Sequence, residues 1–231
     1  VYKRQDLLLA GLHADDKYDE TMSITIKTGS YTAYCAKGSD DHAIYILYPL
    51  DTIDKWVDKA SAQYGVSIIA VTGMDWDNDL TPWSAPGVPD GSEPFAGHAA
   101  QFLDTLTNEI IPGAESRMGL AVTRRDLVGV SLSGLFTVWQ WALCGTFANI
   151  ASLSGSFWYE GFTSWLKGHF PPRAGARAYF SLGSLEGRSR VPQFKTIPQD
   201  TATVVDILKR AGVDTVFETV PGNHYQHGEQ R

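Results

Sequence analysis

The stretch DLVGVSLSGLFTVWQWA, residues 126–142, decides the fold of this chain. It begins with a short apolar run, turns at the small residues SLSG, and continues apolar to Trp141 without proline or a further glycine. A short apolar run, a tight turn and a longer apolar run predict a buried strand followed directly by a buried helix.

Small residues surround the serine at this turn. Gly129 lies two positions before Ser131, and Ser133 and Gly134 lie two and three positions after it. This is close to the G-x-S-x-G pattern of a nucleophile elbow, in which the backbone approaches itself so closely that only small side chains fit. Ser133 stands where glycine is usual. Ser133 fits less well as the nucleophile, because Leu135 would then occupy a position that requires a small residue. The alternative is a serine-rich cap on an ordinary helix.

Length and composition indicate one globular domain. The chain has 231 residues, of which 43% are hydrophobic and 19% charged, as in ordinary folded domains. The net charge of −7 and the lack of a Lys/Arg-rich stretch argue against a nucleic-acid partner. No apolar run approaches the roughly 20 residues that span a bilayer.

The N-terminal residues 1–20 are expected to be a disordered leader. The apolar segment LLLA, residues 7–10, is too short for a signal peptide, so a cytoplasmic protein is expected. Residues 21–231 are expected to form a single domain. Because the sequence stops shortly after His224, this domain is expected to lack its final helix. The oligomeric state is not predicted.

Hydrophobic periodicity predicts alternating strands and helices along the rest of the chain. After a leading antiparallel hairpin, the alternation indicates a doubly wound, mostly parallel α/β sheet of about eight strands. The expected strands are 22–27, 31–35, 43–48, 66–71, 127–130, 149–153, 177–182 and 215–220. The expected helices are 51–64, 95–118, 200–211 and the helix after the turn at Ser131, with a short helix in the aromatic segment 157–170.

A serine nucleophile needs a base and a third group that orients the base. His224 follows the last predicted strand, where active-site groups of such sheets project; His227 is the nearby competitor. Glu186 is the acidic residue in the loop after strand 177–182, between Ser131 and His224 in the chain. The alternative for Glu186 is a surface carboxylate paired with Arg188.

An oxyanion site needs two backbone donors. Leu132 directly follows Ser131 and begins the predicted helix, so its N–H is the first candidate. The second is expected in the loop after strand 43–48, near Leu50 or Asp51, because Pro49 has no N–H to donate.

Two tryptophans are candidate walls of a substrate pocket. Trp83 and Trp158 lie in loops after predicted strands, at the edge of the sheet that carries Ser131. Exposed aromatic rings there would suit a large apolar acyl group; the alternative is that both rings pack in the core. The alternating Asp75, Asp77 and Asp79 lack the glycine and glutamate of a calcium loop, so no metal site is expected there. Catalysis by a serine nucleophile also needs no organic cofactor, and none is expected.

The assembled motifs resemble the esterase family of α/β-hydrolases that includes siderophore esterases similar to enterochelin esterase. The matching stretches are DLTPW (79–83), FLDTLTNEIIP (102–112), GVSLSGLF (129–136), SLSGSFW (152–158), YFSLGSLE (179–186) and PGNH (221–224). The resemblance implies an α/β-hydrolase fold and hydrolysis of small carboxylic esters, with Ser131 as nucleophile and His224 as base. Some members of the family are described as using a Ser–His pair without an acid, which leaves the role of Glu186 open.

Three functions follow as alternatives. The first is a serine esterase that works through an acyl-enzyme intermediate. The second is an acyltransferase on the same scaffold, since the family also contains such enzymes. The third is a non-catalytic binding module, in which the aromatic segment 157–165 would form a ligand surface.

Overall fold

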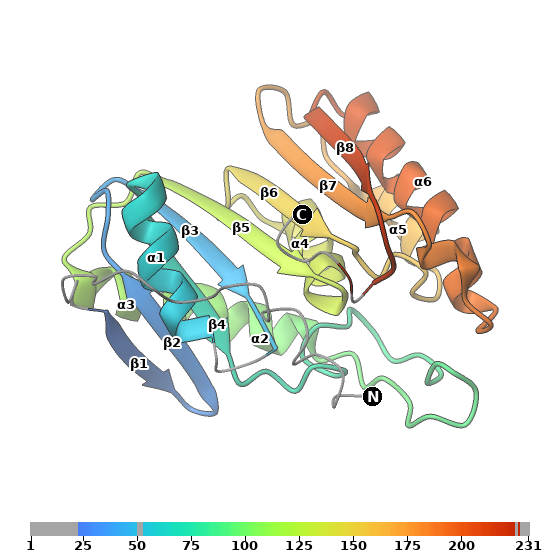
Figure 1. The fold of residues 1–231 in the computed structure, drawn as a ribbon, viewed down its shortest axis with the longest axis horizontal. Helices are drawn as coiled ribbons and strands as arrows, with labels where there is room; N and C mark the ends of the chain where they lie inside the picture. The colour runs from blue at the N-terminus through green and yellow to red at the C-terminus, as the bar shows by residue number, and fades with distance from the viewer. Residues whose placement is uncertain (1–22, 50–52, 225, 227–231) are drawn as a thin grey trace.

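The computed structural model describes residues 23–49, 53–224 and 226 (Figure 1). The expected leader 1–20 therefore lies outside the described residues. The described chain forms one eight-stranded sheet in the order β1-β2-β4-β3-β5-β6-β7-β8. The strands are β1 (Ile24–Thr28), β2 (Tyr31–Ala36), β3 (His42–Leu47), β4 (Ser67–Thr72), β5 (Arg124–Val130), β6 (Asn149–Leu153), β7 (Arg177–Gly183) and β8 (Asp214–Val220).

The sheet is antiparallel only at its leading edge. β1 pairs with β2, and β2 with β4, in antiparallel register. All pairs from β4 to β8 are parallel. The predicted doubly wound, mostly parallel sheet with a leading hairpin is confirmed.

Helices cover both faces of the sheet. They are α1 (Asp54–Tyr64), α2 (Ala99–Thr105), α3 (Ile111–Met118), α4 (Leu132–Leu143), α5 (Phe162–His169) and α6 (Ile197–Arg210). In Figure 1, α1 crosses the near face, while α4 and α5 lie behind the sheet. α6 lies beside β8, and most of its buried apolar residues belong to the same larger core as those of α4 and α5. On β4, Ile68 and Ala70 pack with the α1 side, and Ile69 and Val71 pack into the larger core on the other side. Burial on both faces explains why this strand is apolar at nearly every position.

The predicted helix 95–118 begins later than expected and contains a break in its regular hydrogen bonding. Phe95 forms an isolated β-bridge with Ala85, and the helix begins at Ala99. A π-helical segment, η3 (Leu106–Ile110), separates α2 from α3, and the Ile111 N–H donates to Leu106 O. Pro112 follows this segment directly. In a regular α-helix a proline lacks the N–H for one hydrogen bond and its ring clashes with the carbonyl one turn earlier, so the change in hydrogen bonding lies where the proline requires it.

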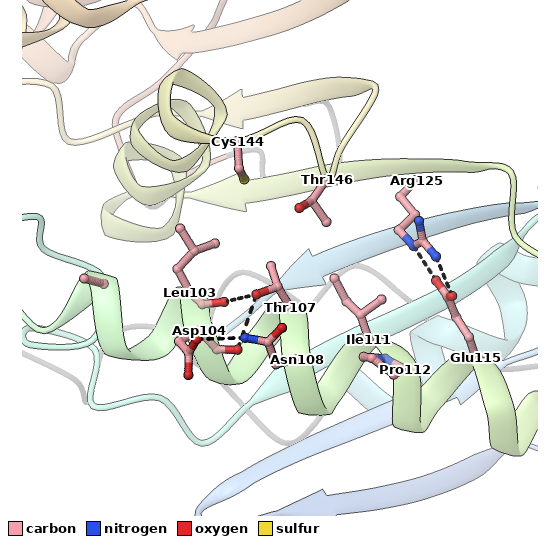
Figure 2. A pocket seen from close by; sticks show the side chains of 11 residues that line it. Leu103, Asp104, Thr107, Asn108, Ile111, Pro112, Glu115, Arg125, Cys144 and Thr146 are labelled. Atoms are coloured by element: carbon pink, nitrogen blue, oxygen red, sulfur yellow. Dashed lines mark hydrogen bonds and ion pairs between the residues drawn. The ribbon is translucent and has the colours of Figure 1, made fainter.

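A groove of about 700 Å³ opens beside this helix (Figure 2). Its lining residues are Ala100, Leu103, Asp104, Thr107, Asn108, Ile111, Pro112, Glu115, Arg125, Cys144 and Thr146. Arg125 lies near the start of β5, whereas Ser131 follows the end of that strand. The groove therefore lies near the amino end of β5, whereas the elbow lies at its carboxyl end. No predicted site residue lines the groove.

An ion pair at the groove connects the helix layer to the sheet. Arg125 Nε and Nη2 donate to the two carboxylate oxygens of Glu115 at 2.6 and 2.7 Å, as Figure 2 shows. The hydroxyl of the buried Tyr45 donates to the same carboxylate at 2.9 Å. A two-point Arg–carboxylate contact with a further donor is a strong polar arrangement when it is largely buried.

The first prediction concerns this ion pair. Glu115→Gln is expected to lower the free energy of unfolding by about 2 kcal/mol, because the half-buried Arg125 loses its charged partner. The measurement is urea denaturation followed by circular dichroism. The control is Asp206→Asn, which breaks the exposed pair with Arg210 and should change the free energy by about 0.5 kcal/mol or less. Equal effects of the two substitutions would contradict the prediction.

Candidate active site

Ser131 lies in a strained backbone conformation between β5 and α4. Its φ and ψ are 57° and −121°, a region that residues with a side chain rarely occupy. The conformation follows from the close approach of strand and helix at Gly129. A Cβ at Gly129 would lie 2.2 Å from the carbonyl oxygen of Ser133, so glycine is required there.

Ser133, the departure from the usual pattern, has a structural role. Its side chain is fully buried. Its hydroxyl accepts a hydrogen bond from the Val130 N–H at 2.7 Å and donates to Leu47 O, 2.9 Å away on β3. Ser131, by contrast, is only half-buried. The Ser133 hydroxyl thus fastens the turn to the neighbouring strand and is inaccessible to a substrate.

Glu186 and His224 are brought into contact although 38 positions separate them in the chain. Glu186 begins the short 3-10 helix η4 (Glu186–Arg188) after β7, and His224 follows β8. His224 Nδ1 lies 2.9 Å from Glu186 Oε2. The Glu186 side chain is 1% exposed, whereas Arg188 is exposed. The alternative that Glu186 is a surface carboxylate is therefore wrong.

Hydrogen bonds keep the buried carboxyl of Glu186 ionised. Burial raises its pKa, but the hydrogen bond and the charge of His224 lower it. Ser154 Oγ and the Gly183 N–H also donate to Glu186 Oε1, at 2.6 and 2.7 Å. Together these contacts outweigh burial, and the pKa of Glu186 lies below its ordinary value.

The nucleophile candidate lies at the same edge of the sheet as this pair. Ser131, Glu186 and His224 follow β5, β7 and β8, and the carboxyl ends of parallel strands meet at one edge. The turn after the intervening strand β6 contacts both Ser131 and Glu186. Ser156 Oγ lies 3.3 Å from Ser131 Oγ, and Ser154 donates to Glu186.

Two backbone donors were predicted for an oxyanion. Leu132 is the first residue of α4, and the first N–H groups of a helix have no acceptor within the helix and lie at its positive end. Leu50 lies outside the described residues, as does His227, the competitor of His224. The choice of His224 as base and of Leu50 as second donor stays a prediction.

The two tryptophans are half-buried in an aromatic cluster. Trp83 Nε1 donates to Glu160 O at 3.0 Å, and its ring lies 6.0 Å from that of Tyr159. The Trp158 ring meets the Phe194 ring edge-on at 4.9 Å. Both side chains also pack against the core. That they form a wall of a substrate pocket therefore stays a prediction.

The acidic loop at Asp75 is held by its own hydrogen bonds. Asp75 Oδ2 accepts from Asn78 Nδ2 at 2.9 Å, and Asp79 Oδ2 accepts from the Asp75 N–H at 2.9 Å. Within the described ranges, no three His, Cys, Asp or Glu residues gather as a metal site would require. Over the same ranges, none of the helices has the length and apolar character of a membrane span.

Sequence reasoning missed Ser154 and Ser156. The turn 154–156 was predicted only as a turn and matched the resemblance as part of SLSGSFW. Ser154 has a φ of 50°. A positive φ at serine is set by tertiary contacts, and no periodic pattern in the sequence signals it.

Comparison of the sequence with known proteins finds a relative of unassigned function. No family model matches the chain. It is 30% identical over 164 residues to the uncharacterized protein YbbA of Bacillus subtilis (strain 168), a match that covers 68% of this chain and 65% of that protein. The chain therefore spans less than two thirds of this curated relative.

Three solved hydrolases resemble the structure. An IroE-like serine hydrolase from Shewanella oneidensis has a TM-score of 0.73 at 17% identity, covering 90% of this chain and 75% of that one. Siderophore hydrolase EstB from Aspergillus nidulans has a TM-score of 0.64 at 17% identity and covers 92% of both chains. Enterobactin and salmochelin hydrolase IroE, also solved in complex with DFP, has a TM-score of 0.62 at 22% identity, covering 87% and 86%. The expected α/β-hydrolase fold is confirmed.

The second prediction is a pH dependence of stability. Because the pKa of Glu186 is lower in the folded protein, its ionised form stabilises the fold above its ordinary pKa, near 4.5, and this contribution is lost as the pH falls through the lowered value. Glu186→Gln is therefore expected to be less stable than wild type at neutral pH, with a difference that shrinks in acid. Urea denaturation across this range measures it. The control Glu160→Gln changes an exposed glutamate and should follow wild type. A constant difference for Glu186→Gln would refute the prediction.

Proposed function

We propose that this protein is a serine hydrolase that cleaves carboxylic esters of small molecules through an acyl-enzyme intermediate on Ser131. The observation that carries the proposal is the strained backbone of Ser131, at the edge of the sheet where Glu186 and His224 also meet. Hydrolases among the structures with the same fold support it.

In the proposed mechanism, Glu186 fixes the orientation of the base. Its contact with His224 Nδ1 favours the tautomer in which Nε2 can accept a proton. His224 takes the proton of Ser131 Oγ as this oxygen attacks the ester carbonyl. The carboxylate stabilises the imidazolium that forms.

The remaining steps require an oxyanion site and a second proton transfer. The N–H of Leu132, and a second N–H near Leu50, would stabilise the oxyanion of the tetrahedral intermediate. His224 then gives its proton to the departing alcohol oxygen. Water then gives a proton to His224 and attacks the acyl-enzyme. The bond between Ser131 Oγ and the acyl carbon breaks, and His224 returns the proton to Oγ as the acid is released.

The strain at Ser131 also favours this proposal over a binding module. Holding a serine in such a conformation costs about 1–3 kcal/mol, and such strain typically persists where function requires it. A binding module has no need of it. An acyltransferase would use the same residues and differ in its acceptor, an alcohol in place of water.

The third prediction tests the nucleophile. A fluorophosphonate probe should label the wild type, and Ser131→Ala should abolish both labelling and ester hydrolysis. Ser133→Ala is the matched control: it should keep labelling while losing about 1–3 kcal/mol of stability, because the Val130 N–H and the buried Leu47 O lose their partner. Labelling is read by mass spectrometry of the intact protein. Undiminished labelling of Ser131→Ala would disprove the assignment.

The fourth prediction tests the proposed pocket wall. Trp158→Ala is expected to lower kcat/KM more for an ester with a large aromatic acyl group than for an acetyl ester, because the large group loses a contact surface. Trp56→Ala removes a half-buried ring that packs on the α1 side of the sheet and should leave the ratio unchanged. The same ratio in wild type and Trp158→Ala would show that the ring only packs the core.

A further inference from the structure

The turn 154–156, which follows β6, contacts both halves of the candidate site. Ser154 and Ser156 are 2% and 3% exposed. Neither residue has a step in the mechanism proposed above. Their hydroxyls nevertheless face the carboxylate of Glu186 and the hydroxyl of Ser131, so the turn is suited to hold these groups in place.

The Ser154 hydroxyl makes a strong contact with the buried acid. The distance from Ser154 Oγ to Glu186 Oε1 is 2.6 Å, which is within the range of a charge-assisted hydrogen bond from a hydroxyl. The Gly183 N–H donates to the same oxygen at 2.7 Å. With two donors on Oε1, the other oxygen, Oε2, faces His224 Nδ1. The Ser154 hydroxyl thus holds the carboxylate with Oε2 directed toward His224.

The backbone at Ser154 is a second observation in favour of a role for its hydroxyl. Its φ of 50° lies in the left-handed region, where glycine is the favoured residue and a side chain adds strain. The Ser154 N–H is anchored to Ser181 O on β7 at 2.8 Å. Glycine would adopt this geometry more easily, yet the chain has a serine whose hydroxyl reaches the acid.

The other end of the turn is attached to the nucleophile. The Ser156 N–H donates to Ser131 O at 3.0 Å, and the two hydroxyl oxygens are 3.3 Å apart. The turn therefore fixes the positions of the acid and the nucleophile relative to each other. Catalysis depends on such relative placement, since small errors in geometry lower rates strongly.

We propose that Ser154 is a positioning residue, whose hydroxyl holds the Glu186 carboxylate toward His224 on a turn that also contacts Ser131. This inference rests on the proposed function, because it assigns a task within that site. Ser154 itself transfers no proton and touches no substrate atom. Its effect is to keep Glu186 oriented when His224 becomes charged during the attack.

Two substitutions at Ser154 test this role. Ser154→Gly removes the hydroxyl and relieves the left-handed strain; Ser154→Ala removes the hydroxyl and keeps the strain. Both are expected to lower kcat roughly 10-fold, with KM unchanged, because loss of one hydrogen bond to a charged group disturbs the transition state and leaves substrate binding intact. The control Ser61→Ala removes an equally buried hydroxyl on α1 that donates to Val66 O and should keep the wild-type kcat.

Proton NMR provides a readout that a purely structural role would not change. The His224 Nδ1 proton, shared with Glu186, should give a downfield signal in wild type and Ser61→Ala. It should weaken or shift in both Ser154 variants and vanish in Glu186→Gln. The spectra are recorded on protein shown by circular dichroism to be folded.

The outcomes separate this inference from the proposed function. If the wild type is not labelled by a fluorophosphonate, the proposed function fails. If the wild type is labelled and the folded Ser154 variants keep both kcat and the downfield signal, only the positioning role is overturned. A loss of stability in these variants without a change in kcat also overturns it.

Discussion

The close approach of β5 and α4 at Gly129 is the constraint on which the candidate site depends. It leaves no room for a Cβ at residue 129 and places Ser131 at a φ of 57°. Strain of about 1–3 kcal/mol at such a residue persists only where the surrounding structure holds it. Here the support comes from a strand paired on both sides and from α4, whose residues from Leu132 to Ala142 are all buried.

Position in the sheet, more than residue type, distinguishes the candidate site. A second histidine–carboxylate pair joins His42 Nε2 to Asp126 Oδ2 at 2.9 Å. Asp126 also accepts from Arg124 and from Asn149. This pair lies at the amino ends of β3 and β5, away from the elbow, and ties strands together. The pair of Glu186 and His224 lies at the carboxyl ends, where the strained serine is.

Sequence reasoning predicted the parts of the structure that rest on burial and chain order. Most strands were found to within a residue or two, because buried strands are largely apolar, and 149–153 was predicted with its observed bounds. β5 begins three residues earlier than predicted, because its first residues, 124–126, are charged and gave no apolar signal. The loop of Glu186 followed from topology alone. The π-helical segment before Pro112 was missed, because hydrophobic spacing does not report hydrogen-bond pattern. Ser154 and Ser156 were missed because their roles depend on partners in distant strands.

The distribution of backbone strain favours a site that is built for chemistry. In the part of the chain that the structure describes, two residues other than glycine have a positive φ, Ser131 and Ser154. They follow neighbouring strands, β5 and β6, and the Ser131 N–H donates to Leu153 O, the last residue of β6. A fold under no functional demand would place glycine at such positions, since glycine adopts them without strain. Serine stands at both positions: the Ser154 hydroxyl donates to Glu186, and the Ser131 hydroxyl is the candidate nucleophile. The strain therefore supports the proposal that the fold holds these two oxygen atoms in place for catalysis.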